Sequence, residues 1–538
     1  MEIGTYYQIA KINLSPVLKK VKKLEKNKDN MYLMGVDIGS TTIKAVIYDI
    51  NGNIISIGRV DTGSPQAIME NGEKVECWIP ETLWQNAVDA IKKSLQRIEN
   101  SSYIKGIAVS AFGVDGGPID KDGNVLFPFI SWQYTGTSGQ MEDFLQNAIP
   151  EDVFKINGQA PWYACSVFRM MWVKKNKPQV YKKIYKWLLI QDFINYRLCG
   201  NAASDYTISS TTLLLDQEKR NWSGYLLSIA GIDKEILPQL KQSGDFLGGV
   251  TRQAALATGL KENTPVVTGG HDNICGSLAA TGYQDGIMVD IGGTFESMIL
   301  HASRPELSNE FMSSNLISEA SVVKNLYALY GFQYYSGCTE WVKMLLESTG
   351  NLEFWKEFES NVNFKTRPGS GGLLFLPYLT GSYFPKDEKI SGAVLGLTIE
   401  TTKLELIRSL IEGLNFISRD LLDLIKKFAN QEIKKIRVIG GITYNDFWMQ
   451  NKADILKMPL EVPDIPEATS LGLSMLAGIG SGLYSSIKDA EEHIKKPSRI
   501  FLPDKNNAVL YDDIYNNLFS DLYGTIRKIS YNIRKYIK

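Results

Sequence analysis

The chain has 538 residues, of which 44% are hydrophobic and 22% charged, a composition typical of a globular protein with more than one domain. Its formal net charge of -1 provides no general attraction to nucleic acid or to a membrane surface. The five cysteines form no CxxC pair, and no apolar run approaches the roughly 18 residues of a membrane span. We therefore expect a reduced, cytoplasmic protein without disulfides, zinc sites, nucleic-acid partners or membrane partners.

The two ends of the chain differ in composition from its middle. Residues 1–30 are rich in lysine and carry neither the apolar core nor the cleavage site of a secretory signal, so we interpret them as a basic N-terminal extension. Residues 501–538 place apolar side chains at helical spacing beneath a surface rich in lysine and arginine. That pattern predicts a C-terminal helical tail that docks on the protein, in preference to a membrane anchor.

The clearest pattern is a repeated hairpin. Residues 35–49 (GVDIGSTTIKAVIYD) read as two β-strands joined by a Gly/Ser/Thr turn, and the Asn51-Gly52 turn predicts a third antiparallel strand after them. Residues 289–300 (VDIGGTFESMIL) repeat V-D-I-G and the threonine two places further on. Two similar hairpins, each opening an α/β region, predict a duplicated domain.

The turn of each hairpin has the chemistry of a phosphate-binding loop. Glycines leave room for a ligand at the backbone, hydroxyls and successive N–H groups bind anions, and an aspartate at the end of a strand suits a hydrated Mg²⁺ ion. Either turn alone is compatible with an ordinary hairpin, but the pair favours a nucleotide held between two loops. The residues in these roles are Asp37 for the metal, and Gly39, Ser40, Thr41, Thr42, Gly293 and Thr294 for phosphate.

A candidate general base stands in the middle of the chain. A short predicted strand ends in Gly269-Gly270, and His271-Asp272-Asn273 then opens a helix of small residues. An aspartate at a helix N-terminus is stabilised as the anion, so Asp272 can accept the proton of a substrate hydroxyl during phosphoryl transfer. The alternative is that Asp272 only caps this helix.

A second glycine pair, Gly440-Gly441, ends the predicted strand IRVI and precedes a helix that begins near Asn445. Such a junction lets a nucleotide approach the backbone closely, and the Asn445 amide can hydrogen-bond to it. A lone glycine pair is a weak signal. Its position in the half of the chain that follows the second hairpin is what favours nucleotide binding.

In this order the segments resemble the FGGY family of carbohydrate kinases, within the actin/hexokinase-like superfamily, over residues 31–500. DIGSTTIK resembles the first phosphate loop of the family, GGHDN its catalytic-base motif, GGTF its second phosphate loop, and GGITYNDFWMQNKADIL its C-terminal nucleotide-binding signature. The further nucleotide contacts that the resemblance implies are Lys44, Gly337, Gly441 and Asn445.

The resemblance implies an α/β fold of two duplicated actin/hexokinase-like (ribonuclease H-like) domains with a catalytic cleft between them. It places the sugar site, the first phosphate loop and the base in an N-terminal domain at residues 31–282, and nucleotide binding in a C-terminal domain at residues 283–500. ATP with Mg²⁺ would lie between the domains, and Asp272 would accept a proton as a sugar hydroxyl attacks the γ-phosphoryl group. Dimers are common in the family, so a homodimer is the assembly that the resemblance suggests.

The substrate is predicted less closely than the reaction. Residues 110–120 (SAFGVDGGPID) and the histidine of GGHDN resemble rhamnulokinases, which implies that Asp115 and His271 hydrogen-bond to substrate hydroxyls. Asn273 could touch the substrate or the transferred phosphate, and Trp132 could form an apolar wall for a sugar face. The alternatives are a turn role for Asp115, a structural role for His271 and simple core packing for Trp132.

One departure from the family pattern limits the substrate prediction. Many members carry a WxDxR motif where this chain has SWQYTGTSG, so Tyr134 and Gly136 replace its acid and its arginine. Losing both charges argues against the specificity of any familiar member, and we expect a small ketose or a polyol.

Other functions remain compatible with the sequence. A kinase of the same fold could act on a non-sugar hydroxylated metabolite, and the altered Tyr134–Gly136 segment supports that alternative. A non-catalytic nucleotide or sugar sensor would not need to retain Asp272 beside the two loops. A chaperone-like or actin-like ATPase is disfavoured by the GGHDN motif, although fold alone does not decide function.

Overall fold

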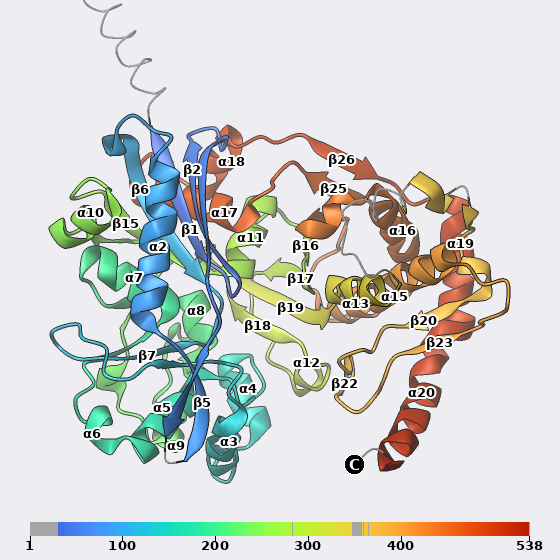
Figure 1. The fold of residues 1–538 in the computed structure, drawn as a ribbon, viewed down its shortest axis with the longest axis horizontal. Helices are drawn as coiled ribbons and strands as arrows, with labels where there is room; N and C mark the ends of the chain where they lie inside the picture. Colours follow the sequence, from blue (N-terminus) through green and yellow to red (C-terminus); the bar gives the residue numbers. More distant parts are fainter. Residues whose placement is uncertain are drawn as a thin grey trace, which may run out of the picture.

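The computed structural model describes residues 31–536 apart from 71, 282, 347–357, 359 and 364, so the predicted basic extension lies outside the described residues. Within this part of the chain, two large mixed sheets organise the protein (Figure 1). The first has the strand order β14-β15-β6-β1-β2-β3 and the second the order β18-β19-β17-β16-β24-β25-β26. The first sheet consists of β1 (Tyr32–Ile38), β2 (Thr42–Asp49), β3 (Ile54–Asp61), β6 (Ile104–Ala111), β14 (Phe246–Gly249) and β15 (Pro265–His271). The second consists of β16 (Ile287–Gly292), β17 (Phe295–Ala302), β18 (Ile317–Ala320), β19 (Tyr327–Tyr334), β24 (Lys435–Ile439), β25 (Leu460–Pro463) and β26 (Ser498–Phe501).

The two sheets repeat one topology. In each, an antiparallel set (β1-β2-β3 and β16-β17-β19) is followed on its other side by two parallel strands (β6-β15 and β24-β25) and one antiparallel strand (β14 and β26). Each domain has its own buried core, around Val36 and Val109 in the first and around Met298 and Val438 in the second. The repetition confirms the predicted duplicated α/β fold.

The hairpins follow from their local sequence. β1 and β2 are nearly continuous runs of buried residues, because helices cover both faces of their sheet. α2 (Pro80–Leu95) packs on one side and α17 (Ala468–Gly480) on the other. Gly52, with φ +70°, supplies the left-handed residue of the turn between β2 and β3, so the predicted third strand is confirmed.

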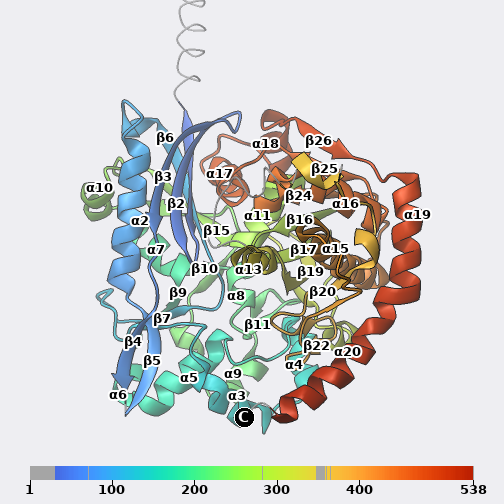
Figure 2. The same ribbon diagram turned by 45° about the vertical axis from the view of Figure 1, so that its right-hand side comes forward.

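The two domains meet across a pair of helices. α11 (Asp272–Thr281) follows β15 directly and packs against α17, between the two sheets in Figures 1 and 2. A side chain at Gly472 would overlap the Cys275 carbonyl oxygen, and one at Gly35 would overlap the Ser470 carbonyl oxygen. Glycine at these points therefore allows the closest approach of α17 to the first domain.

The remaining elements form two groups. One is a lobe inserted in the chain between β6 and β14, and the other is the outer part of the second domain. The lobe helices are α3 (Ser138–Leu145), α4 (Pro150–Asn157), α5 (Ser166–Asn176), α6 (Pro178–Tyr181), α7 (Ile190–Cys199), α8 (Tyr206–Ser210) and α9 (Gly224–Ala230). The other helices are α10 (Arg252–Thr258), α12 (Asn309–Ser313), α13 (Ser336–Leu346), α15 (Lys403–Phe428), α16 (Asp446–Leu456), α18 (Ile487–His493), α19 (Lys505–Ile514) and α20 (Ser520–Ile533). The short strands are β4 (Gln66–Glu70), β5 (Glu73–Trp78), β7 (Gly116–Ile119), β8 (Phe129–Ile130), β9 (Lys186–Leu189), β10 (Ala203–Asp205), β11 (Leu215–Asp216), β12 (Asn221–Trp222), β13 (Gln239–Lys241), β20 (Leu374–Leu376), β21 (Ser382–Tyr383), β22 (Lys386–Asp387) and β23 (Ala393–Leu395).

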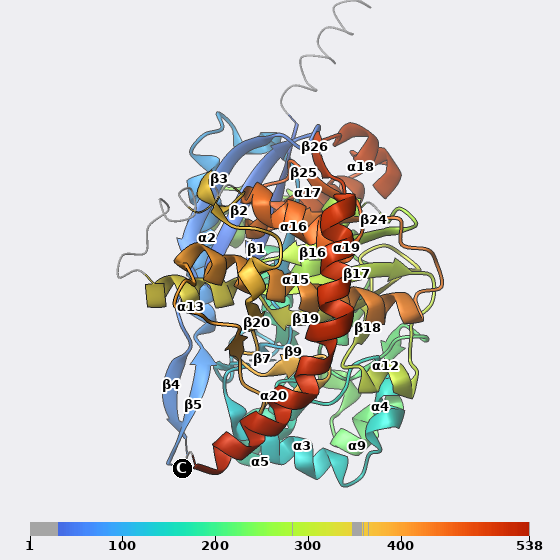
Figure 3. The same cartoon turned by 90° about the vertical axis from the view of Figure 1, so that its right-hand side faces the viewer.

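The C-terminal tail runs along the outside of the second domain. Figure 3 shows α19 and α20 crossing the face that α15 and α16 form beneath them. Tyr511, Phe519 and Ile526 of the tail are buried in one cluster with Phe416 of α15. Among the described residues, no helix has both the length and the apolar character needed to span a membrane.

Candidate active site

Asp272 is the first residue of α11, at the point where β15 ends. Its Oδ1 accepts a hydrogen bond of 2.7 Å from the Asn273 backbone N–H, while 34% of its side chain remains exposed. Partial burial raises the pKa of this carboxyl group, and the neighbouring His271 opposes that rise. A raised pKa makes the carboxylate a stronger proton acceptor, which suits a general base.

Asp37 is the penultimate residue of β1. β1 pairs in parallel with β6, and β6 pairs in parallel with β15, the strand that precedes Asp272. The Ser110 hydroxyl donates to Asp37 Oδ1 at 2.9 Å. Burial and then the Asp272 carboxylate raise the pKa of Asp37 to about 7. The two sequence-predicted carboxylates therefore lie within electrostatic reach of each other, an arrangement that a cation between or beside them would relieve.

The side chains near Asp37 fit a metal ion that is held mainly by water and phosphate oxygens instead of protein groups. Among the described residues, no group of three or more His, Cys, Asp or Glu side chains is arranged to hold a metal. One carboxylate with water and phosphate oxygens is a common way to bind Mg²⁺, which keeps several of its waters. Asp37 thus fits Mg²⁺ that arrives with a nucleotide better than a resident ion in a protein cage.

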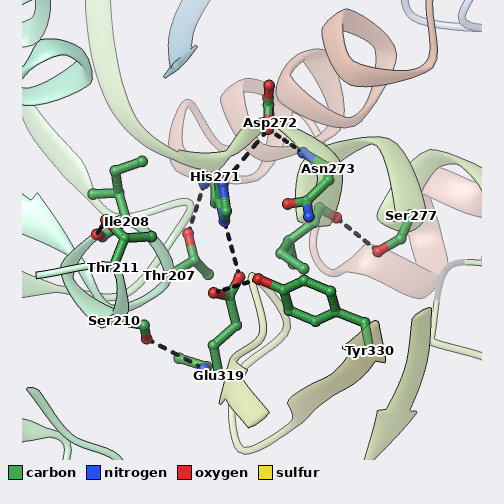
Figure 4. A network of polar contacts seen from close by, with 12 residues as sticks. Thr207, Ile208, Ser210, Thr211, His271, Asp272, Asn273, Ser277, Glu319 and Tyr330 are labelled. Carbon is green, nitrogen blue, oxygen red and sulfur yellow. Dashed lines mark hydrogen bonds and ion pairs between the residues drawn. The ribbon is translucent and has the colours of Figure 1, made fainter. Parts of the chain in front are cut away.

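His271 links the base to the second domain (Figure 4). Its Nδ1 lies 3.0 Å from Oε1 of Glu319 on β18, and its Nε2 lies 3.7 Å from Asp272 Oδ1. The Tyr330 hydroxyl donates to the other Glu319 oxygen at 3.1 Å, and the Thr207 hydroxyl accepts from the His271 backbone N–H at 2.7 Å. Burial lowers the pKa of His271, but the Glu319 carboxylate outweighs burial and raises it to about 9. His271 is therefore an imidazolium at neutral pH, with its charge placed between two carboxylates.

The predicted substrate segment lies against His271. A side chain at Gly113 would come within 3.2 Å of His271 Nε2. The next residue, Val114, has φ +68°, a strained conformation for a β-branched residue, and it is held by Thr211, whose hydroxyl accepts from its N–H at 3.0 Å. The Ser166 hydroxyl donates to the Val114 carbonyl at 2.6 Å. This fixed turn sets the direction of the chain at Asp115, the next residue.

Asp115 is fully buried in a polar cluster at the base of this segment. Its Oδ2 accepts from Trp78 Nε1 at 2.8 Å and from the Trp132 backbone N–H at 3.1 Å, and its Oδ1 lies 3.2 Å from the Arg169 guanidinium. Burial raises the pKa of Asp115 to about 6 against the opposing effects of Arg169 and Trp78. Because the side chain has no exposed surface, a substrate hydroxyl reaches Asp115 only if one of these neighbours moves.

The segment that departs from the WxDxR pattern divides into two parts. Trp132 is half-buried, and its backbone is tied to Asp115. Tyr134 instead turns into the core, where its ring meets Trp172 edge to face at 6.3 Å. A side chain at Gly136 would overlap the Tyr134 ring, so this tyrosine needs the glycine that follows it. Tyr134 and Gly136 together form a packing unit where the family motif has two charges.

The first predicted phosphate loop has exposed hydroxyls on a tied-down turn. Ser40 and Thr41 are exposed and Thr42 is half-buried. The Thr62 hydroxyl donates to the Gly39 carbonyl at 2.6 Å, and the Thr62 N–H donates to the Thr41 carbonyl at 3.0 Å. These two bonds fix the turn in place.

Lys44 lies beside this loop and is paired with the second half of the chain. Its Nζ donates to Glu467 Oε2 at 2.8 Å, and Arg59 donates to the other Glu467 oxygen. Glu467 immediately precedes α17, so the pair links the first hairpin to the helix between the domains. The Lys44 charge also lowers the pKa of Asp37, which places both side chains in one electrostatic site.

The second predicted loop brings its residues together as expected. The Thr294 carbonyl accepts from the Tyr335 N–H at 2.9 Å and from the Gly337 N–H at 3.5 Å. The Ser336 hydroxyl donates to the Gly293 carbonyl at 2.6 Å. Gly293, Thr294 and Gly337 thus meet at the start of α13, with Thr294 exposed.

The glycine pair at the end of β24 lies against this second loop. Gly440 has φ +98°, and a side chain there would overlap the Gly292 carbonyl oxygen, whereas a side chain at Gly441 would enter open space. The Asn445 side chain caps α16 by accepting from the Trp448 N–H at 2.8 Å, which leaves its amide N–H₂ group as the available donor. The two segments expected to hold opposite parts of a nucleotide are therefore neighbours.

The repeated aspartates of the two hairpins have different environments. Asp290 occupies the place in β16 that Asp37 occupies in β1, but it is fully buried and pairs with the equally buried Lys452 of α16. Lys452 also pairs with Glu296 of β17. Only the first copy of the motif has its carboxylate at the site.

Sequence reasoning missed several residues that shape the site. Glu319, Thr207 and Tyr330 hold His271, and the sequence assigned none of them a role at the site. Glu319 shows only one local signal, a single acid within an otherwise uncharged strand. Its partner depends on how two distant sheets come together, which no local pattern encodes.

Comparison with known proteins gives a consistent result. Residues 32–279 match the N-terminal domain, and residues 289–481 the C-terminal domain, of the FGGY family of carbohydrate kinases. The chain is 27% identical to an L-fuculokinase of Escherichia coli K12 over 472 residues, 88% of this chain and 97% of the relative. It is 26% identical to a xylulose kinase of Lactococcus lactis over 516 residues, 94% of this chain and 99% of the relative. A gluconate kinase structure from Lactobacillus acidophilus, 22% identical, covers 92% of this chain and 98% of its own with a TM-score of 0.81, which confirms the fold. Because the two domain matches cover most of the chain, the protein belongs to the FGGY family of carbohydrate kinases and uses ATP to phosphorylate a sugar or polyol.

Proposed function

We propose that this kinase phosphorylates a hydroxyl group of a small ketose, with Asp272 as the general base. The observation that supports this proposal most directly is the position of Asp272, partly exposed at the start of α11 between His271 and the Asp37 side of the site. The names of the relatives, an L-fuculokinase and a xylulose kinase, support a ketose over other acceptors.

In the proposed reaction the Asp272 carboxylate accepts the proton of the substrate hydroxyl. The hydroxyl oxygen forms a bond to the γ-phosphorus of ATP as the bond between that phosphorus and the β–γ bridging oxygen breaks, which releases ADP. The imidazolium of His271 keeps Asp272 ionised and orients it. Two facing loops, with Gly39, Ser40, Thr41 and Thr42 on one side and Gly293, Thr294 and Gly337 on the other, bind the phosphates.

Mg²⁺ accompanies ATP in this proposal, with Asp37 as its protein ligand, directly or through water. Lys44 lies within electrostatic reach of Asp37, and its charge lowers the pKa of that carboxyl group. Gly441 and Asn445 contact the nucleoside end of ATP. For the substrate, His271, Asn273 and Trp132 line the site, and Asp115 holds the Trp132 backbone from below.

The domain division follows from the same proposal. We place the sugar site, first phosphate loop and base in residues 31–282, the nucleotide-binding domain in residues 283–500, and a helical tail in residues 501–538. A cytoplasmic location and a homodimer accord with a metabolic kinase of this family.

A coupled ADP-release assay tests this function. Purified protein with Mg·ATP is screened with L-fuculose, xylulose, further ketoses, aldoses and polyols, and each acceptor that stimulates turnover is repeated with Asp272→Asn. We expect stimulation by a ketose that is lost in Asp272→Asn while ATP binding is retained. Stimulation by non-sugar acceptors alone would replace the ketose assignment, and near-normal turnover of Asp272→Asn would remove this residue from the base role.

A further inference from the structure

A buried tyrosine of the C-terminal tail reaches into the core of the second domain. Tyr511 lies on α19, which crosses α15 and α16 in Figure 3, and its side chain is fully buried. Its hydroxyl donates to Glu412 Oε1 at 2.6 Å, and it accepts from Asn451 Nδ2 at 2.8 Å and from Arg408 Nη2 at 3.2 Å. A hydroxyl has one proton and two lone pairs, so these bonds use its full hydrogen-bonding capacity.

Two asparagines continue the contact from Tyr511 toward the second sheet. The Asn415 Nδ2 donates to Asn451 Oδ1 at 2.8 Å, and the Tyr335 hydroxyl donates to Asn415 Oδ1 at 2.6 Å. Both asparagines are buried, and every nitrogen and oxygen of their two side chains has a partner. Rotating either amide by half a turn would set two donors or two acceptors against each other, so each orientation is fixed by its neighbours. We call the series Tyr511, Asn451, Asn415 and Tyr335 the polar relay.

The polar relay ends at the second phosphate loop. The Tyr335 N–H donates to the Thr294 carbonyl at 2.9 Å, so Tyr335 belongs to the relay through its hydroxyl and to the loop through its backbone. Trp448 Nε1 donates to the same hydroxyl at 3.0 Å, and the Trp448 N–H donates to the Asn445 side chain at 2.8 Å. The relay therefore holds two segments that are proposed to contact ATP, the loop at Thr294 and the start of α16 at Asn445.

The tail end of the polar relay is anchored firmly. Glu412 on α15 accepts from Arg408 Nε at 2.8 Å and from the Ser370 hydroxyl at 2.7 Å. The start of α19 is attached to α16, where the Asp504 N–H donates to Asp454 Oδ1 at 2.8 Å. Tyr511 is thus held in place from both sides, and it can orient the side chains that follow it in the relay.

We propose that Tyr511 is a positioning residue for ATP, which acts through Asn451 and Asn415 on the segments at Thr294 and Asn445. The C-terminal tail is then a functional part of the nucleotide site. Without the Tyr511 hydroxyl, the Asn451 amide keeps a buried donor that has lost its acceptor, and a buried polar group must find another partner. The amides then turn, and Tyr335 loses its fixed hydrogen bond. The inference rests on the proposed function for the role of the loop, whereas the contacts of the relay do not.

Nucleotide binding to the full-length protein tests the inference without any sugar. The Kd of AMP-PNP, a non-hydrolysable ATP analogue, is measured with Mg²⁺ by calorimetry for wild type, Tyr511→Phe, Tyr335→Phe and the double variant. Tyr515→Phe is the matched control. The ring of Tyr515 packs on Phe416 with that of Tyr511, but its hydroxyl donates to Asp420, outside the relay.

We expect Tyr511→Phe to raise the Kd about fivefold, and Tyr515→Phe to change it less than about twofold. The double variant should match Tyr335→Phe alone, because both substitutions interrupt the same relay. An unchanged Kd in Tyr511→Phe would reject the inference. An equal rise in Tyr515→Phe would assign the effect to packing of the tail, and additive effects in the double variant would reject the relay.

A measurement on the wild type decides the case even if a variant does not fold. Because coupling is reciprocal, a saturating concentration of AMP-PNP with Mg²⁺ should slow hydrogen exchange of the amides in α19 but not of those in α20. Equal exchange of α19 with and without the nucleotide would reject the inference. Thr294→Ala separates it from the proposed function: normal AMP-PNP binding in this variant, with weaker binding in Tyr511→Phe, would remove Thr294 from phosphate binding and leave Tyr511 acting through Asn445.

Discussion

His271 and Glu319 form an ion pair that joins the two domains next to the proposed base. Their Nδ1 and Oε1 atoms are 3.0 Å apart, although His271 ends a strand of the first sheet and Glu319 lies on β18 of the second. Only 2% of the Glu319 side chain is exposed, so solvent screens the pair little. The protonation of His271, and through it the charge environment of Asp272, therefore depends on a residue of the other domain.

Replacing Glu319 with Gln should shift the pH dependence of catalysis. Without the carboxylate, burial lowers the pKa of His271 from about 9, so this side chain loses its charge near neutral pH. Asp272 then lacks the positive neighbour that lowers its pKa, and it stays protonated to higher pH. We expect the acidic limb of the kcat/KM profile to move up by roughly one pH unit. Glu310→Gln, which removes an exposed acid of α12, serves as the control; equal profiles for Glu319→Gln and wild type would contradict the role of the pair.

The same pair should make the stability of the protein depend on pH. His271 has an ordinary pKa of 6.5 when unfolded and about 9 when folded. Its stabilising contribution is therefore fully present below pH 6.5 and is lost as the pH rises through 9. At 1.36 kcal/mol per pKa unit the loss is roughly 3 kcal/mol. Thermal unfolding midpoints between pH 6 and 10 should fall more steeply for wild type than for Glu319→Gln, and parallel curves would show that His271 is not held as a cation.

The glycine pair at residues 440–441 offers a matched test of nucleotide binding. Gly440→Ala places a side chain against the Gly292 carbonyl at φ +98°, so the segment must move away from the second phosphate loop. Gly441→Ala meets open space on the protein side. Strain of 1–3 kcal/mol, expected for such a backbone position, corresponds to a rise of roughly tenfold or more in the ATP KM of Gly440→Ala. The Gly441→Ala variant reports on the ligand itself: an ATP KM raised while unfolding is unchanged would place the nucleotide directly on this residue. Normal ATP KM values in both variants would remove the pair from the nucleotide site.

Asp37→Asn tests the proposed metal role. The substitution keeps the shape of the side chain and the hydrogen bond with Ser110 but removes the negative charge beside Asp272. We expect kcat to fall by roughly a hundredfold or more, as for the loss of one preorganised electrostatic contact, and the Mg²⁺ concentration for half-maximal rate to increase. Ser110→Ala, which leaves the charge in place, should affect the Mg²⁺ requirement far less. An unchanged Mg²⁺ requirement in Asp37→Asn would place the ion elsewhere.

The parts of the site that could be predicted from sequence are those encoded by contiguous residues. The hairpin around Gly39 and the strand-to-helix junction at Asp272 depend on local strand propensity and on glycines at turns, so their positions follow from the sequence alone. The partners Glu319 and Glu467 lie 48 and 423 residues from the side chains they hold, and only the order of strands in the sheets brings them there. Tyr134 shows what a motif comparison leaves open, since the comparison indicates only that a charge is lost there, while packing against Trp172 is what turns the side chain into the core.

The loss of Lys452 should strongly destabilise the second domain. Its ammonium group is fully buried between Asp290 and Glu296, below the second phosphate loop, and the two carboxylates outweigh burial to raise its pKa well above the ordinary value. Lys452→Met keeps the volume but leaves two buried carboxylates without a cation, which costs about 3–5 kcal/mol of unfolding free energy. The control Lys427→Met removes a half-exposed surface pair with Glu310, worth at most about 1 kcal/mol. Urea unfolding monitored by tryptophan fluorescence separates the two, because Trp448 lies in the same helix as Lys452. Equal midpoints for both variants would show that the Asp290 carboxyl is neutral in the folded protein. Asp37 and Asp290 would then differ in their protonation instead of in their ion-pair partners.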